Sequence, residues 1–297
     1  MLGNRSGFAA LLKKEIANLK ITNCFLHRHA LAAKTLPPDL RKILEISVKV
    51  VNMIRSRALN HRLFQSFCEE VGKEHTVLLY HTEVRWLSRG RVLSRLFELR
   101  DEIQQFLREA GHELAEYFDD PEFVQALAYL ADVFTALNEL NHSLKGRGIS
   151  ILDACEKLSA FKEKLLLWIR CVKKGNLVNF PSLEETLTKD ASLHPHFLSK
   201  IVEHLQLLCI SFDGYFSCGE LQTCDHWIRY PFRMNSEDIN DDSDITEDLI
   251  DMRNNYGIQM KFSTGNLEHF WDSKMETYPV LAKKALDVLV PFATTYL

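Results

Sequence analysis

Four arginines and one tryptophan gather in "EVRWLSRGRVLSR", a short stretch that spans residues 83–95. The apolar run "TVLLYHTEV", which leads into it, has the composition of a buried strand. The residues that follow have the spacing of an amphipathic helix with arginines on its outer face. Guanidinium groups bind phosphate oxygens, so this junction is a candidate contact for a polyanion. The candidate residues are Arg85, Trp86, Arg89, Arg91 and Arg95.

Cysteine and histidine occur once at a spacing that zinc accepts, in Cys24-x-x-His27, with His29 close by. A structural zinc site needs four ligands, and no second pair has a suitable spacing. The other cluster of such residues consists of Cys218, Cys224 and His226. We therefore predict no metal site, and expect Cys24 to be a buried thiol with His27 hydrogen-bonded nearby.

Three pairs of neighbouring carboxylates could in principle hold a divalent metal ion: Glu69–Glu70, Asp119–Asp120 and Asp241–Asp242. Each pair lies at an expected helix end or in an acidic stretch, where the helix dipole and solvation account for it. The chain also has no glycine-rich phosphate loop and no G-x-S-x-G motif. The residues therefore predict no cofactor and no small-molecule substrate.

Composition bounds the class of protein. The chain has 297 residues, of which 46% are hydrophobic and 26% charged, as in one large or two ordinary globular domains. The N-terminus lacks the apolar region of a signal peptide, and no apolar run approaches the roughly 20 residues that span a bilayer. Seven cysteines at irregular spacing are typical of reduced thiols in the cytosol or nucleus.

Charge is distributed unevenly along the chain. Residues 1–110 carry 19 basic and 11 acidic side chains, a balance of +8, whereas the remaining residues have a balance of −12. A polyanion contact is therefore expected in the first part. The alternative is that a helical protein simply has solvated charged faces. Residues 235–251 hold eight acidic and no basic residues, which predicts an exposed, mobile linker.

Helical periodicity dominates the sequence. Pro37 and Pro38 suit a helix start, as do Asp120 as the N-cap and Pro121 in the first turn of the next long helix. A helix about 20 residues long is expected, with apolar positions that run from Val92 to Leu107. Two long helices then have matching apolar stripes, which predict an antiparallel hairpin. The stripes are Phe123, Leu127, Leu130, Phe134, Leu137, Asn141 and Leu144, and then Ala154, Leu158, Phe161, Leu165, Trp168 and Val172.

Several blocks of the sequence resemble one family, the domesticated hAT-type transposases of vertebrates. They are "NCFLHRHALAAKTLPPDL", "HTEVRWLSRGRVLSRLFELRDEI", "LNELNHSLKGRGISILDACEKLSAFKEKLLLW", "FPSLEE" and "YPVLAKKALDVLVPFATTYL". The family includes zinc-finger BED, SCAN-domain and transcription factor II-I repeat proteins. The resemblance implies an RNase H-like core that is interrupted by a large helical insertion, with a dimerisation segment at the C-terminus.

The resemblance also implies that the family's three catalytic carboxylates lie outside this chain. Two would precede Met1 and the third would follow Leu297, so both ends of the chain look cut. Because the family's strand cleavage needs those carboxylates to hold two metal ions, we expect no transposase or nuclease activity.

Individual residues acquire expected roles from the same resemblance. Trp86 takes the position of a tryptophan that stacks on an extruded base, and Arg85 can contact phosphate. The alternative is that Trp86 packs into the helical core while Arg85 pairs with Glu83 or Glu98. Cys24 and His27 match the family's Cys-x-x-His motif. The expected dimerisation residues are Phe270, Trp271, Tyr278, Leu281, Leu286 and Leu289, for which packing within one chain is the alternative.

The predicted fold is mainly α, with a partial RNase H-like core whose sheet is incomplete. The predicted division is residues 1–84 for that core, 85–234 for the helical insertion, 235–262 for the acidic linker and 263–297 for the start of the dimerisation segment. The favoured function is a non-catalytic scaffold that binds nuclear proteins or forms a homodimer, and the nucleus is favoured over the cytoplasm as its location. The alternatives are a DNA-binding module and a fragment of an active transposase. No membrane partner is expected.

Overall fold

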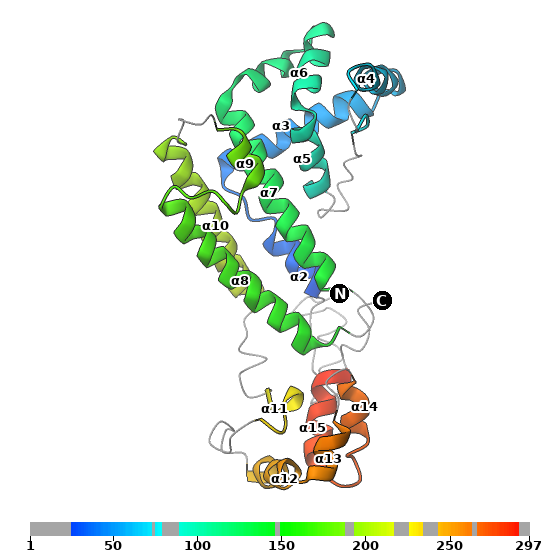
Figure 1. The fold of residues 1–297 in the computed structure, drawn as a ribbon. Coiled ribbons are helices and arrows are strands. Elements are labelled where there is room, and N and C mark those ends of the chain that lie inside the picture. Colours follow the sequence, from blue (N-terminus) through cyan, green and yellow to red (C-terminus); the bar gives the residue numbers. More distant parts are fainter. Residues whose placement is uncertain are drawn as a thin grey trace, which may run out of the picture.

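The computed structural model describes residues 25–72, 75–78, 89–145, 149–187, 193–216, 226–233, 243–262 and 266–290 (Figure 1). Helices dominate this part of the chain, and it contains no β-strand, so the prediction of a mainly α protein is confirmed. The helices are α2 (Phe25–Ala32), α3 (Pro38–Arg55), α4 (Ala58–Glu70), α5 (Arg89–Glu98), α6 (Arg100–Glu109), the 3₁₀ helix η2 (Glu113–Asp119), α7 (Pro121–Ser143), α8 (Ile151–Lys173), α9 (Pro181–Glu185), α10 (Pro195–Tyr215), α11 (His226–Arg229), α12 (Ser243–Arg253), α13 (Tyr256–Lys261), α14 (Leu267–Asp272) and α15 (Pro279–Leu289).

The segments expected to be strands early in the sequence lie only partly within the described residues. The pattern of "ITNCFLHRHAL" predicts a short buried strand that runs into a helix; residues 21–24 lie outside the described residues, and helix α2 follows from Phe25. In "TVLLYHTEV", residues 76–78 have no regular secondary structure, and residues 79–84 lie outside the described residues. The RNase H-like core therefore stays a prediction.

Several helices begin where local chemistry predicts. Helix α3 starts at Pro38, and α7 starts at Pro121 after the N-cap Asp120, whose Oδ1 accepts a hydrogen bond from the Glu122 amide at 2.9 Å. Both starts are confirmed. Helix α8 has a capping box, in which the Ser150 hydroxyl and the Asp153 carboxylate each accept a hydrogen bond from the other residue's backbone amide.

The predicted apolar stripes of α7 and α8 are buried, but the hairpin prediction is wrong in its packing. Every stripe residue of both helices is buried. However, α7 packs most extensively on α5, and α8 packs most extensively on α10, whereas the contact between α7 and α8 is small. The reason is that α7 buries further residues beside its stripe, such as Ala128 and Val133. A helix buried on several sides lies at the centre of a bundle and has several partners.

The helix expected from Val92 to Leu107 is two helices, α5 and α6. They meet at Leu99, whose backbone leaves the helical conformation at φ −98° and ψ 20° while its side chain stays buried. This break redirects the chain, and α6 packs on η2 and α4.

The buried side chains form two hydrophobic cores. The first runs from Ala32 to Phe216 and includes α3, α5, α7, α8 and α10. The second runs from Trp227 to Leu289, at the other end of the molecule in Figure 1. The first core combines α3 with α7, on either side of the boundary expected between residues 84 and 85. The predicted domain division as a whole stays a prediction.

The acidic linker predicted at residues 235–262 needs a correction, because residues Ser243–Arg253 form helix α12. Ile245, Leu249 and Met252 are spaced four and three residues apart, and all three are buried in the second core. The acidic residues Glu247 and Asp251 are exposed. The acidic charge therefore covers the outer face of an amphipathic helix, a pattern that net charge alone does not reveal.

Candidate functional site

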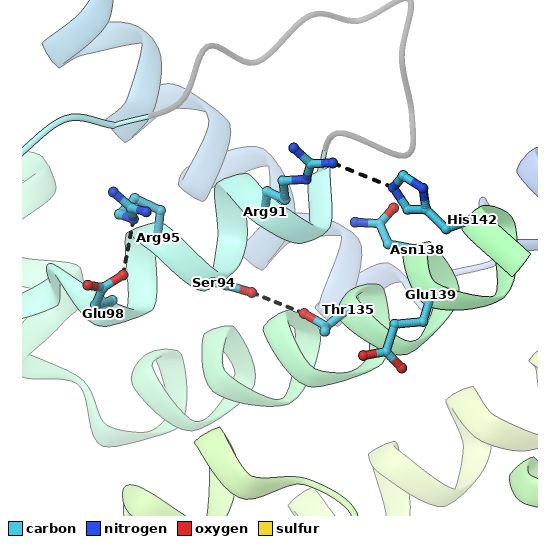
Figure 2. A pocket seen from close by; sticks show the side chains of 8 residues that line it. All are labelled: Arg91, Ser94, Arg95, Glu98, Thr135, Asn138, Glu139 and His142. Atoms are coloured by element: carbon cyan, nitrogen blue, oxygen red, sulfur yellow. Dashed lines mark hydrogen bonds and ion pairs between the residues drawn. The ribbon is translucent and has the colours of Figure 1, made fainter. Parts of the chain in front are cut away.

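The candidate site is a cleft between α5 and α7, and it exists because these two helices approach each other closely at Gly90. A Cβ atom added to Gly90 would lie 2.3 Å from Asn138 Nδ2 and 2.7 Å from the carbonyl oxygen of Phe134. Only glycine fits at such a distance. The helix axes are thus held together at the first turn of α5, and the side chains of the following turns form the walls of the cleft (Figure 2).

The cleft has a volume of about 420 Å³, and polar side chains predominate in its lining. Four of them come from α5 and four from α7: Arg91, Ser94, Arg95 and Glu98, and then Thr135, Asn138, Glu139 and His142.

Two polar contacts cross the cleft. The Ser94 and Thr135 hydroxyls lie 3.1 Å apart, and Ser94 Oγ also donates to the Gly90 carbonyl at 3.0 Å. Near the start of α5, the Arg91 guanidinium lies 3.5 Å from His142 Nε2. Because arginine only donates, His142 Nε2 is the acceptor in this contact. Both Arg91 and His142 are exposed, so this end of the cleft is open to solvent.

The far end of the cleft holds a charge network. Arg95 Nε lies 3.0 Å from Glu98 Oε2, and His75 Nδ1 lies 2.6 Å from Glu98 Oε1. An Arg95 Nη also reaches the carbonyl of Val77 at 3.5 Å. Glu98 is therefore the partner of Arg95 and His75, as Figure 2 shows for the arginine. Counted over the whole lining, the two positive charges of Arg91 and Arg95 are matched by the two negative charges of Glu98 and Glu139.

In the N-terminal half of α7, a buried polar chain connects this helix with α10. His204 Nε2 of α10 donates to the Thr35 carbonyl at 3.1 Å, and His204 Nδ1 accepts from the Tyr129 hydroxyl at 2.8 Å. The Thr35 hydroxyl lies 2.7 Å from the Ser211 hydroxyl. Burial lowers the pKa of His204 to about 4 and raises that of Tyr129 well above its ordinary value. The ring is thus neutral near pH 7 and serves as both donor and acceptor.

The arginines predicted from the sequence fall into three groups. Arg91 and Arg95 line the cleft, but Arg95 is already paired with Glu98. Arg89 begins α5, and its side chain lies outside the description. Arg85 and Trp86 lie outside the described residues, so their predicted nucleic-acid contact stays a prediction.

The Cys-x-x-His motif is covered only in part. Cys24 lies outside the described residues, and His27 is placed only as part of the backbone of α2. His29, two positions after His27, is fully buried. Its pKa is lowered to about 4 by burial, with a smaller contribution from the charge of Lys145. Within the residues that the structure describes, no three histidine, cysteine or acidic side chains are grouped as metal ligands would be.

The predicted dimerisation residues lie in the second core. Five of them are buried there, and Leu286 is partly buried against it. Trp271 is fully buried, and its Nε1 donates to the Ile228 carbonyl at 2.9 Å. Dimerisation through this segment stays a prediction, and it would have to use the segment's outer faces.

Sequence reasoning missed the wall of the cleft that α7 provides. Thr135, Asn138 and His142 lie more than 40 positions after Arg91 in the chain, and no motif connects them to it. The one available signal was Gly90, a glycine inside a helical pattern, which often marks close approach of another element. None of the described helices is long and apolar enough to cross a membrane.

Comparison with known proteins gives a family match and one informative relative. Residues 23–173 match the model of the FAM200/GTF2IRD2 helical domain, which covers α2 to α8 and hence both walls of the cleft. The whole chain is 30% identical over 304 residues to the bovine (Bos taurus) protein called general transcription factor II-I repeat domain-containing protein 2. This chain spans 31% of the length of that relative. No solved structure matches.

Proposed function

Since the chain belongs to the FAM200/GTF2IRD2-like family of helical domains, we propose that it is a transposase-derived, non-catalytic scaffold of the nucleus that binds other proteins. The sequence resemblance to transcription factor II-I repeat proteins agrees with the named relative. That name supports a regulatory role in the nucleus, and the hAT-type origin is part of the proposal.

The observation that carries this proposal is the charge balance of the α5/α7 cleft. A site for a polyanion needs an excess of unpaired positive charge. Here Arg95 is neutralised by Glu98, and the negative Glu139 offsets Arg91. The hydroxyls of Ser94 and Thr135 can each both donate and accept hydrogen bonds. A polypeptide segment, which presents both kinds of group and both signs of charge, fits such a lining better than a phosphate backbone does.

Site-specific photo-crosslinking tests this function. A photoreactive residue at Thr135, which lies in the cleft and is exposed, should crosslink nuclear proteins from extract. The same probe at the exposed Ser159 on α8 is the matched control. We expect a crosslinking yield at Thr135 several-fold above that at Ser159. An excess of the same chain without the photoreactive residue should suppress the crosslinking at Thr135. Equal yields at both positions would contradict a protein-binding cleft.

A second candidate function, residual DNA binding, is favoured by Arg91. This side chain is exposed at the open end of the cleft, two residues after Arg89. DNA binding should then appear as fluorescence anisotropy of labelled duplex or hairpin DNA that falls steeply as salt rises. Arg91→Glu should abolish it, and Glu139→Gln should strengthen it. Arg91 is the better residue to change because replacing Arg95 would also break its pair with Glu98.

A further inference from the structure

Helix α4 presents an apolar pair that is exposed in the part of the chain that the structure describes. Leu59 and Leu63, one helical turn apart, are 61% and 52% exposed. The opposite face of α4 is anchored by Phe64 and Cys68, which are fully buried. Phe64 packs edge-on against Phe106 of α6, with 5.4 Å between the ring centroids. The leucine pair is therefore the outer face of a docked helix, held in place from behind.

The charges of α4 are arranged against its helix dipole. Arg57 at the N-cap and Arg62 in the second turn are exposed, whereas Glu69 and Glu70 occupy the C-terminal turn. The first turn has no acidic residue, the last turn has no basic residue, and no side chain caps the N-terminus. Positive charge at the N-terminal end is unfavourable for the helix. An acidic partner beside Arg57 and Arg62 would relieve this.

The second core carries the complementary surface. Tyr256 and Met260 of α13, again one helical turn apart, are 73% and 70% exposed. Helix α13 packs on α12, whose exposed residues include the acidic Glu247 and Asp251. The exposed charged side chains described on α12 and α13 are Glu247, Asp251 and the basic Lys261, so acidic groups outnumber basic ones two to one. The exposed charges nearest in sequence to the leucine pair of α4 are instead those of Arg57 and Arg62.

Figure 1 shows α4 and α13 at opposite ends of the molecule, so the two faces of one chain do not meet. We propose that the α4 face of one copy binds the α12–α13 face of a second copy, head to tail. This inference rests on the proposed scaffold function and names one of its partners. Because the two faces differ, such a contact is heterologous, and each bound pair leaves one face of each kind free. The result is an open chain or a ring whose size grows with protein concentration.

The contact is small and partly ionic, which sets its expected behaviour. Two apolar residues on each side make an interface at the weak, transient end of the range, so self-association should appear at micromolar concentration or above. Exposed ion pairs are screened by salt. Raising the salt concentration from about 50 mM to about 500 mM, where the screening length becomes a few ångströms, should therefore shift the species towards monomer.

A mixing experiment distinguishes this arrangement from a symmetric dimer. Leu59→Gln with Leu63→Gln blocks the α4 face, and Tyr256→Gln with Met260→Gln blocks the α13 face. Each double variant should be monomeric by sedimentation velocity, and an equal mixture of the two should form a one-to-one dimer, because each supplies the face that the other lacks. Leu166→Gln with Leu167→Gln, on exposed positions of α8, is the control that should associate like the wild type.

A charge exchange tests the ionic part without changing apolar residues. Arg57→Glu with Arg62→Glu should weaken association, as should Glu247→Lys with Asp251→Lys, and all four changes in one chain should restore it. Circular dichroism confirms that each variant is folded. A wild type that stays monomeric at several hundred micromolar, or a mixture that does not dimerise, would overturn the proposal. Crosslinking at Thr135 would be unaffected by that outcome, so the scaffold function would be judged separately.

Discussion

Arg229 on α11 forms an ion pair with Asp153 in the first turn of α8, and this pair joins the two hydrophobic cores. The same guanidinium contacts Glu156 Oε1 at 2.6 Å. Arg229 is only 13% exposed, and Leu152 of α8 packs against the second core beside it. Asp153 also belongs to the capping box of α8. Burial raises the pKa of Asp153, but hydrogen bonds from Ser150 and Arg229 outweigh it, and the pKa is lowered overall.

Replacing Arg229 should therefore loosen the second core from the first. In Arg229→Met, two carboxylates lose their common partner in a partly buried place, at a cost of about 1–3 kcal/mol. Hydrogen exchange should show faster opening of α14 and α15, with the centre of α7 unchanged. Lys162→Met, which removes an ion pair with Asp213 that is more exposed, is the control and should have a smaller effect. Equal protection of α14 in both variants would argue against a joining role.

A second prediction concerns the close approach of α5 and α7. Gly90→Ala should destabilise the protein by about 1–3 kcal/mol, because the added methyl group clashes with Asn138 and with the backbone of Phe134. Gly214→Ala is the matched control, since it changes a glycine of α10 whose Cβ would meet nothing within 4 Å. That change should stabilise the protein by up to about 1 kcal/mol through helix propensity. Urea unfolding of the two variants measures the difference, and equal stabilities would show that the helices can separate at no cost.

The sequence predicted the buried faces of α7 and α8 but not the helices that cover them. An apolar stripe such as Phe123 to Leu144 shows which side of a helix is buried, and any other stripe can pack on it. The choice of α5 as the main partner of α7 depends on Gly90, a single small residue. For the same reason only Arg91 and Arg95 of the lining were singled out from the sequence, while Thr135 and His142 became visible only when α7 was placed beside α5.

Net charge misled the prediction at residues 243–253. Residues 235–251 hold eight acidic residues and no basic one, a composition that indicates disorder when apolar residues are scarce. The decisive pattern was instead the spacing of Ile245, Leu249 and Met252, which gives one helix face enough apolar area to join the second core. Short amphipathic helices of this kind owe their stability to packing and little to their own propensity.

A third prediction is that stability falls with acid because of the buried histidines. His204 and His29 both have a pKa of about 4 in the folded protein, against an ordinary value of 6.5. A depressed folded pKa means that the unfolded chain binds protons first. The stability that each neutral histidine contributes is therefore fully present above pH 6.5 and is lost as the pH falls towards 4. At pH 5 the loss should be about 2 kcal/mol for each histidine.

The measurement is the free energy of unfolding in urea at several pH values between 7 and 4. His204→Gln should lower stability at pH 7, because Tyr129 loses the acceptor that it has in His204, yet it should also reduce the slope below pH 6.5. His196→Gln, at an exposed position, serves as the control. An unchanged slope in His204→Gln would mean that this ring takes up a proton as readily in the folded protein as in the unfolded chain.

The fourth prediction tests whether α12 is a folded part of the second core or an acidic linker. Leu249 is 2% exposed and lies in the middle of the helix, so Leu249→Asp places an unpaired charge among apolar side chains. The loss should be about 3 kcal/mol or more, because both the apolar transfer energy and the cost of burying a charge oppose folding. Glu247→Gln changes an exposed position of the same helix and should alter stability by less than about 0.5 kcal/mol. Since α12 packs on α15, Leu249→Asp should also speed amide exchange in α15, far from the substitution in sequence. A mobile linker would tolerate both changes equally and leave α15 protected, so the contrast between the two variants separates the two descriptions.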